Sequence, residues 1–226
     1  GLVPVCLRTA YRDSLRLART RSIMTVHNLA YQGVFWHWDW PLLGLDWSFF
    51  NWQALEFYGK INMLKGGLLY ADAITTVSRT YSREIQTPEY GCGLDGVFRY
   101  RKEVVHGHVN GLDVSNWDPS GDPKIPARFS AADITGKAEC KRALQRECGL
   151  DPGMGNLLCG MTGKLTEQNG LDLLLECGDE MLMRLPIQLV ILGDGAKRQR
   201  TAVEELARRY PGRIFARLAY LSSAER

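Results

Sequence analysis

The sequence predicts an α/β protein built from two doubly wound halves that meet near Leu112. On both sides of that residue, short apolar strands alternate with helical segments, which is the pattern of parallel sheets covered by helices. The chain has 226 residues, of which 45% are hydrophobic, so one or two cores of ordinary size can form. Glycine and polar residues follow several of the strands, and ligands of open parallel sheets bind at that edge.

Composition excludes several classes of protein. The net charge of +3 is small and no long basic run is present, so we expect no nucleic-acid partner. The sequence contains no signal peptide and no apolar run of membrane length, so we expect a soluble protein without a membrane contact. The six cysteines are scattered without a C-x-x-C pair, which is typical of reduced thiols in an intracellular protein.

In the first half, hydrophobic periodicity predicts the elements in a simple order. We expect a helix at the start of the chain, then strand 22–26, helix 61–69, strand 73–77, a helix from about Arg79 and strand 104–109. After the last strand, Asn110-Gly111 is a strong turn signal because both residues tolerate positive φ. His106 and His108 alternate on that strand, but without a third ligand nearby we expect no metal there. Lys65 is interpreted as a solvated or capping lysine.

The second half follows a connector that contains several prolines. We expect helix 137–148 ended by Gly149, strand 157–161, helix 171–185 ended by Pro186, strand 187–192, helix 199–209 and strand 213–217. Glycine after a helix favours a left-handed cap, and proline cannot continue a helix, so both helix ends are well marked. This second alternation of strands and helices predicts a second parallel sheet.

The turn between strand 157–161 and helix 171–185 contains Lys164, with Gly163 before it and Gly170 beside the helix start. Free backbone N–H groups and the helix dipole favour an anion at such a position, and the Lys164 ammonium adds a full charge. The alternative is an ordinary strand–helix connection with a solvated lysine. From this segment alone both interpretations stay open.

Two further strand ends carry candidate binding residues. His27 and Asn28 follow strand 22–26 directly, at the edge where an α/β sheet usually places its chemistry. A lone histidine at a strand end is, however, more often a structural hydrogen-bonding residue. Gly193 and Gly195 follow strand 187–192, where Gly-x-Gly lets a backbone approach a nucleotide, although the motif alone is not specific.

Residues 34–60 are crowded with aromatic side chains. Flat rings stack on the faces of sugars, but they are also the largest contributors to ordinary packing. For any single ring, packing is the more frequent role. The excess of rings in one loop indicates that one or two of them contact a sugar. The tryptophans in this stretch are Trp36, Trp38, Trp40, Trp47 and Trp52.

Three strings of the sequence resemble motifs of the bacterial glycogen synthases and plant starch synthases. They are TVHNLAYQGVF at 25–35, GMTGKLTEQNGLDLL at 160–174 and QLVILGDG at 188–195. The first is nearly identical to a signature of this family. The second is similar to a family turn that is usually written S-R-L-T-x-Q-K-G-x-D-L. The resemblance covers nearly the whole chain.

The resemblance implies the GT-B glycosyltransferase fold, with two Rossmann-like domains that are both incomplete here. Residues 1–112 would be the C-terminal part of the N-terminal, acceptor-side domain, and residues 113–226 the first part of the C-terminal, nucleotide-sugar-binding domain. The implied reaction moves glucose from ADP-glucose to the 4-hydroxyl at the non-reducing end of an α-1,4-glucan, with retained anomeric configuration. No cofactor and no metal are implied, because cations of the protein neutralise the diphosphate.

The resemblance also implies roles for individual residues. His27 would reach the transferred glucose, while Lys164 and Asn169 would stabilise the departing ADP. At these last two positions the family has arginine and lysine. The residues that the resemblance assigns to substrate binding are Asn28, Asn110, Gly193 and Gly195.

Other functions stay open as alternatives. The main alternative is a degenerate, non-catalytic paralogue that binds glucan or nucleotide, because Lys164 and Asn169 depart from the family pattern. A different nucleotide-sugar transferase of the same fold is disfavoured by the HNLAYQG string, and a nucleotide-binding oxidoreductase by the lack of G-x-G-x-x-G after the first strand.

The resemblance places the family's K-x-G-G-L loop before Gly1, its D-W-H strand end immediately before Gly1, and its carboxylate segment of E-x-x-G-L type after Arg226. We therefore expect the chain to be an internal portion of a longer protein, and expect this portion alone to be inactive. The resemblance places the protein in the cytoplasm if it is bacterial, or in the plastid if it comes from a plant or alga.

Overall fold

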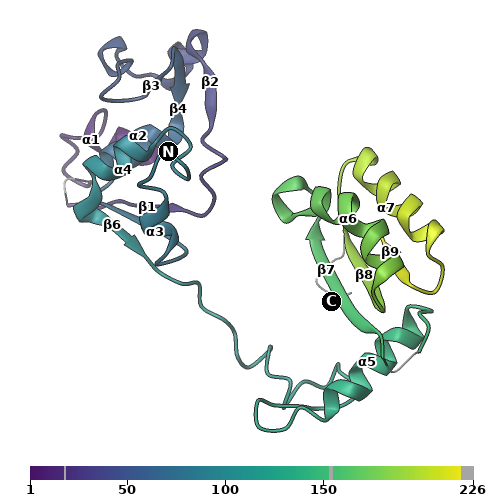
Figure 1. Ribbon diagram of the computed structural model, residues 1–226. Helices are drawn as coiled ribbons and strands as arrows, with labels where there is room; N and C mark the ends of the chain where they lie inside the picture. Colours follow the sequence, from purple (N-terminus) through teal and green to yellow (C-terminus); the bar gives the residue numbers. More distant parts are fainter. Residues whose placement is uncertain (18, 153–154, 220–226) are drawn as a thin grey trace. The chain divides into compact units, whose positions relative to one another are not determined.

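The structure is a computed structural model that describes residues 1–17, 19–152 and 155–219 (Figure 1). The chain forms two compact units, Gly1–Leu112 and Asp113–Arg226, and each contains a three-stranded parallel sheet. Each unit also has its own hydrophobic core. The predicted α/β class with parallel sheets is therefore confirmed.

The parallel sheet of the first unit has the strand order β1-β5-β6. Buried side chains of the helices, including Leu64, Leu68 and Phe98, pack against Val26 and Ile74 of the sheet. The strands and helices predicted for this region are confirmed, with somewhat shorter bounds. These are β1 (Ile23–Val26), α2 (Met63–Tyr70), β5 (Ala73–Thr76), α3 (Tyr81–Glu84) and β6 (Val105–Gly107). Two further elements were not predicted, α4 (Asp95–Tyr100) and the 3-10 helix η3 (Lys102–Val104).

Side chains outside α2 fix both of its ends. At the N-terminus, Asn62 Oδ1 accepts a hydrogen bond from Lys65 N at 2.9 Å, as an N-cap residue does. At the C-terminus, the Arg101 guanidinium donates to the carbonyl oxygens of Leu68 at 3.1 Å and Ala71 at 2.6 Å. These bonds satisfy carbonyl groups that a helix end leaves without an intrahelical partner. Helix α2 is thus a well-anchored wall of the unit.

The interpretation of Lys65 as a solvated or capping lysine is wrong. The residue is only 6% exposed. Its Nζ donates to the carbonyl oxygen of Trp52 at 2.6 Å and also to that of Glu56. Burial lowers the pKa of Lys65 below the usual lysine value, and the nearby charge of Glu56 partly opposes this shift. Carbonyl groups of a distant loop, which a helical pattern does not reveal, compensate for the burial of this charge.

Between β1 and α2 the chain forms a small antiparallel sheet that the sequence did not predict. Together with α1 (Leu2–Arg8), this sheet encloses a second core around Val5, Trp40 and Leu55. The ring of Trp40 is therefore part of a core, whereas the other four tryptophans of residues 34–60 stay exposed. The elements, with the strand order β2-β4-β3, are β2 (Val34–Trp36), η1 (His37–Leu43), η2 (Trp47–Phe49), β3 (Glu56–Phe57) and β4 (Lys60–Asn62).

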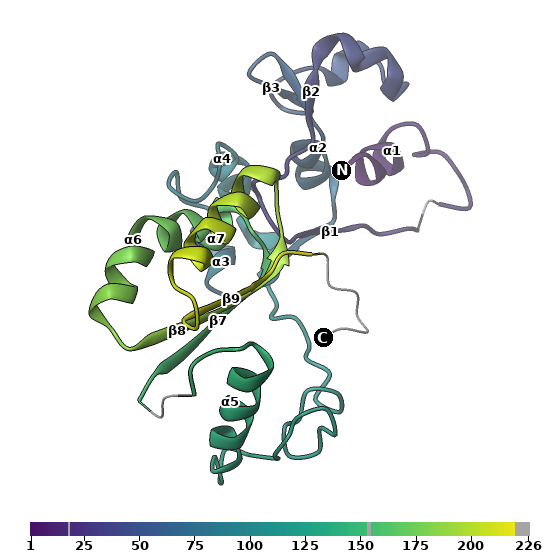
Figure 2. The same cartoon turned by 90° about the vertical axis from the view of Figure 1, so that its right-hand side faces the viewer.

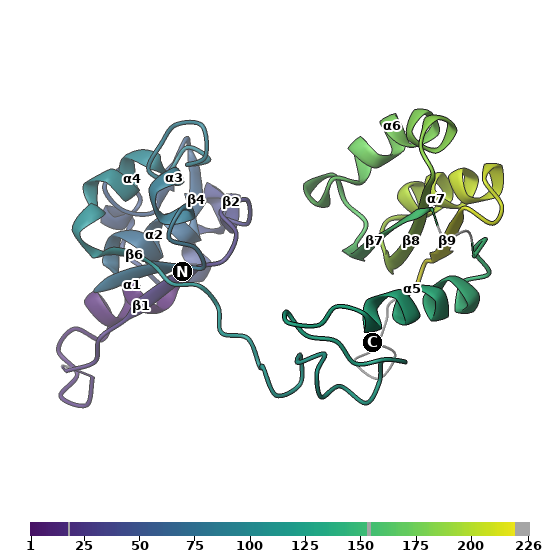
Figure 3. The same ribbon diagram turned by 60° about the horizontal axis from the view of Figure 1, so that its bottom comes forward.

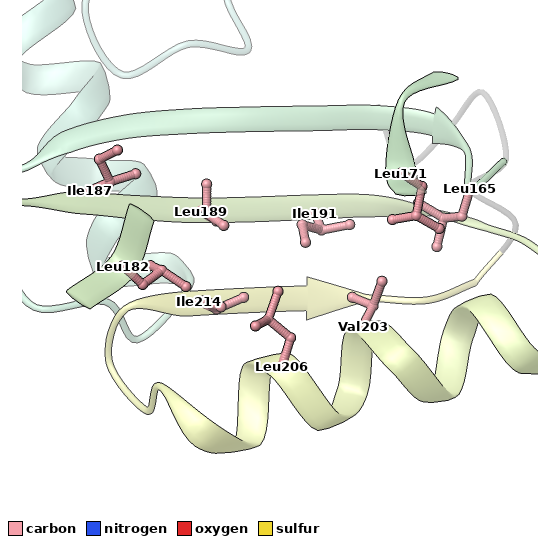
Figure 4. Packing of buried hydrophobic residues seen from close by; sticks show 9 residues of the cluster. All are labelled: Leu165, Leu171, Leu182, Ile187, Leu189, Ile191, Val203, Leu206 and Ile214. Carbon is pink, nitrogen blue, oxygen red and sulfur yellow. The ribbon is translucent and has the colours of Figure 1, made fainter. Parts of the chain in front are cut away.

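The second unit is a parallel sheet of order β7-β8-β9 with helices on both faces. Helices α6 and α7 lie on one face and α5 on the other (Figure 2 and Figure 3). Ile187, Leu189 and Ile191 of β8 pack toward α6 and α7 (Figure 4), while Gln188 accepts a hydrogen bond from Gln145 of α5 at 2.6 Å. The elements are α5 (Gly136–Glu147), β7 (Leu157–Lys164), η4 (Glu167–Asn169), α6 (Leu171–Arg184), β8 (Ile187–Asp194), α7 (Lys197–Arg209) and β9 (Ile214–Arg217).

Two details of the predicted organisation are wrong. Asn110-Gly111 forms no turn and neither residue has positive φ, because the chain passes there from one unit to the other and no partner strand follows. Strand β7 continues to Lys164, which pairs with Asp194 of β8. Lys164 is therefore the last residue of the strand and not part of the turn. The pairing of β7 with β8 continues through the polar residues at the end of β7.

Neither a membrane-spanning helix nor a cluster of metal-ligating side chains is found among the described residues. None of their helices is long and apolar enough to span a membrane. Among the same residues, no three His, Cys, Asp or Glu side chains are grouped so that they could hold a metal ion. The rings of His106 and His108 are 6.4 Å apart between centroids and have no such third partner in this part of the chain.

Candidate functional site

The first candidate edge is the carboxyl end of β1, where His27 and Asn28 begin a short loop. Leu29 is buried, and its N–H donates to the Tyr81 hydroxyl at 3.1 Å. Asn28 Oδ1 accepts from Ala30 N at 2.9 Å, which forms an Asx turn. Because these contacts anchor the loop, His27 is held at the edge of the sheet while its side chain stays exposed.

The other two strands of this parallel sheet end at the same edge. Thr76 of β5 pairs with Gly107 of β6, and His108 N donates to the Thr76 carbonyl oxygen at 2.8 Å. A Cβ at Gly107 would lie 2.4 Å from the Ser78 carbonyl oxygen, so this strand end requires glycine. Asn110, predicted to bind substrate, lies beyond the end of β6 in the connection to the second unit. The structure places His27 and Asn28 side by side, but Asn110 outside this sheet edge.

The second candidate edge is the carboxyl end of β7, where Lys164 and Asn169 flank a compact loop. Both residues are exposed, and Asn169 Nδ2 donates to the Lys164 carbonyl oxygen at 2.7 Å. Leu165 and Leu171 are fully buried and anchor the loop at both sides. Gly170 has φ of 79°, a left-handed conformation that favours glycine. The two predicted residues are therefore in contact, but this contact uses the Asn169 amide to close the loop.

Gly193 and Gly195 lie where β8 ends against β7. A Cβ at Gly193 would be 1.8 Å from the Gly163 carbonyl oxygen, and one at Gly195 would be 2.7 Å from the Leu165 carbonyl oxygen. Neither distance leaves room for a side chain. Both glycines are thus required for the close packing of two strand ends, independently of any ligand. The same packing leaves the edge free of side chains at these two positions.

Basic residues that the sequence reasoning did not single out lie next to this edge. The carboxylate of Asp194, which pairs with Lys164 across the ladder, accepts from Gly195 N at 2.8 Å. Arg200 Nη1 lies 3.5 Å from the same Asp194 oxygen. Arg200 belongs to the first turn of α7, whose first two residues are also basic. The signal in the sequence was the string KRQR at 197–200, one residue after Gly193-Asp194-Gly195.

These groups make the edge of the second unit suited to an anionic ligand. In the described residues, no acceptor is found for the backbone N–H groups of Asp172 and Leu173 in the first turn of α6. Such free N–H groups and the helix dipole attract negative charge. The exposed ammonium of Lys164 and the cations at the start of α7 add to that attraction, which the carboxylates of Glu167, Asp172 and Asp194 partly offset. The balance of charge is positive.

Comparisons of the sequence with known proteins agree with one another. Residues 1–100 match a family model described as the starch synthase catalytic domain. Over 220 residues the chain is 49% identical to a glycogen synthase of Anaeromyxobacter sp. (strain Fw109-5), and over 224 residues it is 47% identical to one of Paracidovorax citrulli. Both comparisons cover 97% of this chain but only 46% and 44% of the relatives. The chain thus spans slightly less than half the length of these curated relatives.

A solved structure is similar as well. The catalytic domain of starch synthase IV from Arabidopsis thaliana, bound to ADP and acarbose, matches 95% of this chain with a TM-score of 0.82 and 28% sequence identity. The matched part is 45% of that structure's chain. The parallel sheets of the two units and this similarity define the fold as that of the GT-B glycosyltransferases. Together with the sequence identities, they show that the chain belongs to the glycogen/starch synthase family.

Proposed function

We propose that the whole protein moves glucose from ADP-glucose to the 4-hydroxyl at the non-reducing end of an α-1,4-glucan, with retention of the anomeric configuration. The observation that supports this most is the loop after β7, where the Lys164 ammonium and free N–H groups of α6 gather positive charge. Glycogen synthases at up to 49% identity support the substrates. The ADP and acarbose bound to the Arabidopsis protein support a nucleotide and a carbohydrate as ligands.

In this proposal the two units contact different parts of ADP-glucose. The first unit is part of the acceptor-side domain, and its His27 and Asn28 contact the transferred glucose. The second unit is part of the nucleotide-sugar-binding domain, with Gly193 and Gly195 at the nucleotide. Asn110, which follows β6 near the end of the first unit, is also proposed to bind substrate.

The chemistry follows from the charges at the second edge. The bond between the anomeric carbon and the diphosphate oxygen breaks, the glucan 4-hydroxyl oxygen takes its place, and that hydroxyl loses its proton. Negative charge develops on the departing ADP. Lys164 and the N–H groups of α6 would stabilise this charge because they are already oriented when it appears. Protein cations thus perform the neutralisation, and the proposal includes no metal or cofactor.

The curated relatives named above are bacterial, which supports a cytoplasmic rather than a plastid location for the whole protein. Asn169 weakens the leaving-group site relative to the family pattern, because it supplies a neutral amide where a lysine is usual. We therefore expect a slow enzyme.

The proposal is tested by measuring the incorporation of radiolabelled glucose from ADP-glucose into glycogen. The full-length protein is expected to give slow but measurable incorporation, with UDP-glucose as the comparison donor. The 226-residue chain is expected to give none above a protein-free blank, since it spans less than half the length of its curated relatives. Clear turnover by the 226-residue chain would contradict the division of the site between this chain and the rest of the protein. ADP binding without any transfer by the full-length protein would instead favour a non-catalytic paralogue.

A further inference from the structure

A pocket of about 280 Å³ lies in the first unit at the edge of the parallel sheet opposite to His27. Asp72 directly precedes β5, and Thr20 lies three residues before β1. Because the two strands are parallel, their amino ends share this edge and their carboxyl ends share the other, about 13 Å away for strands of four residues. The pocket is therefore outside the candidate transfer site. Its lining residues are Leu7, Arg8, Arg12, Leu17, Thr20 and Asp72.

The carboxylate of Asp72 fixes two arginines beside this pocket. Its Oδ1 accepts from Arg21 Nη1 at 3.0 Å and also from Arg8 Nη2, while its Oδ2 accepts from Ser22 N at 2.8 Å. The bond from Ser22 N, and more weakly the two arginines, lower the pKa of Asp72, so the carboxylate keeps its charge. A guanidinium has five N–H donors, so Arg8 is held by this contact and keeps further donors for a ligand.

Arg12 is the second cation in the lining, and turns of the backbone hold its position. Arg12 N donates to the Thr9 carbonyl oxygen at 3.1 Å, and Ser14 N donates to that of Tyr11 at 3.1 Å. The Arg12 side chain is exposed and forms no ion pair with any residue that the structure describes. Its planar group of donors is thus available to a ligand.

Acceptors at the carboxyl end of α1, next to the pocket, are already occupied. The Val5 carbonyl oxygen accepts from the Thr9 hydroxyl at 2.8 Å. The Cys6 carbonyl oxygen accepts from Thr9 N at 3.3 Å and from Tyr11 N at 2.9 Å. These donors reduce the repulsion that the carboxyl end of a helix exerts on an anion.

Positive charge prevails around the pocket. Residues 8–21 include five arginines and one acidic residue, Asp13. Asp72 adds a second negative charge, but two of the arginines already pair with it. The arginines are Arg8, Arg12, Arg16, Arg19 and Arg21. An anion that enters the pocket therefore meets a surplus of cations.

Charge and size together decide which anion fits. The planar guanidinium matches the oxygens of a phosphate group, and Arg8 and Arg12 together balance two negative charges. The Thr20 hydroxyl can add a further donor. A volume of about 280 Å³ is below the range of pockets that enclose drug-sized ligands, which favours a small anion over a nucleotide. Leu7 and Leu17 leave room for a small apolar group beside it.

We propose that this pocket binds a small phosphate dianion, either inorganic phosphate or the phosphate group of a small phosphomonoester. The bound anion bridges Arg8 at the end of α1 and Arg12 in the loop that follows, which is drawn in purple in Figure 2. It stabilises the first unit, because a ligand that binds only the folded state shifts the unfolding equilibrium. The site is independent of the glucosyl transfer proposed for the whole protein.

The test is isothermal titration calorimetry of the 226-residue chain with sodium phosphate, in a sulfate-free buffer of constant ionic strength. All proteins carry Lys164→Gln, which removes the exposed ammonium at the anionic edge of the second unit. Saturable binding at millimolar concentration is expected. Arg12→Gln is expected to weaken it about tenfold, because a hydrogen bond from a charged donor is lost.

Arg16→Gln is the matched control, because it removes the same charge from the same loop but does not line the pocket. It is expected to leave the phosphate affinity nearly unchanged. Arg12 and Arg16 are both exposed, so neither substitution disturbs a core, and circular dichroism verifies that both variants keep the fold.

Phenyl phosphate distinguishes the two sources of the phosphate group. If the pocket is built for a phosphomonoester, phenyl phosphate binds more tightly than inorganic phosphate, and Leu17→Ala removes that advantage. If it is built for inorganic phosphate, the two probes bind alike and Leu17→Ala changes neither.

Three results would overturn the proposal. The first is an Arg12→Gln variant that binds both probes like the unchanged arginine. The second is an Arg16→Gln variant that loses as much affinity as Arg12→Gln, since the binding would then reflect only the general charge of the loop. The third is the absence of saturable binding of either probe at millimolar concentration.

Discussion

Replacing His27 with alanine in the full-length enzyme is expected to lower kcat by about a hundredfold or more and to leave ADP binding nearly unchanged. The His27 side chain is exposed on a loop that Leu29 and Tyr81 hold in place, so its removal leaves the backbone undisturbed. A contact with the transferred glucose that strengthens in the transition state lowers kcat and kcat/KM together when it is lost. A structural role would not produce that pattern.

The measurement combines initial rates over a range of ADP-glucose concentrations with the dissociation constant of ADP. His106→Ala is the matched control, since His106 is also exposed in the first unit but lies within β6 and not at its end. It is expected to keep the original kcat. An unchanged kcat in His27→Ala would show that this histidine is merely a structural residue of the strand end.

The second large effect is expected from Asn169→Lys, which restores the charge that the family has at this position. One preorganised donor is worth about 3 kcal/mol at a catalytic site. A gain of this size corresponds to an increase in kcat of about a hundredfold. The substitution also removes the bond from Asn169 Nδ2 to the Lys164 carbonyl oxygen, which costs about 1 kcal/mol of loop stability and does not enter kcat directly. Lys164→Arg is expected to add to the increase in kcat, because guanidinium binds phosphate oxygens with two parallel bonds.

Both effects on kcat are measured from the initial rates of four full-length proteins. These are the unmodified protein, Asn169→Lys, Lys164→Arg and the double variant. Neighbouring groups on one ligand are expected to be non-additive, so the double variant also measures their coupling. Gln168→Lys is the control, because it adds the same charge one residue away on the exposed side of η4. If the unmodified protein is already fast and Asn169→Lys does not change its rate, the assignment of Asn169 to the phosphate site is wrong.

Local patterns were sufficient to predict most of the fold. Strands β1, β5, β8 and β9 and the four longest helices (α2, α5, α6 and α7) follow from apolar periodicity and from glycine or proline at their ends. These signals act within a few residues of the element that they define. The three-residue and two-residue strands of the small antiparallel sheet have too little periodicity to stand out among the aromatic residues around them.

Features that depend on distant partners could not be predicted. Lys65 is on an amphipathic-looking helix, and only the folded loop shows which carbonyl groups accept its bonds. The length of β7 depends on its ladder with β8, which pairs Lys164 with Asp194 across 30 residues of sequence. Asn110-Gly111 has the composition of a turn, but in the structure it lies in the segment that leads from β6 to the second unit and forms no turn.

The candidate site likewise has some features that the sequence indicated and others that only the structure shows. The sequence indicated the loop with Lys164 and Asn169 because strand, glycine, lysine and helix start follow one another directly. It did not indicate that the Asn169 amide bonds to the Lys164 carbonyl, since the family pattern assigns this position to the ligand. Nor did it indicate that Gly193 is required by the Gly163 carbonyl oxygen, because that contact arises only when β7 and β8 lie side by side.

The proposed reaction adds glucose in α-1,4 linkage to the non-reducing end of a glucan. It is tested by incubating the full-length protein with radiolabelled ADP-glucose and linear maltoheptaose and digesting the product with β-amylase. That enzyme releases maltose from non-reducing α-1,4 ends. We expect the label to be recovered as maltose. Label that resists β-amylase, or label that never enters the oligosaccharide, would contradict it.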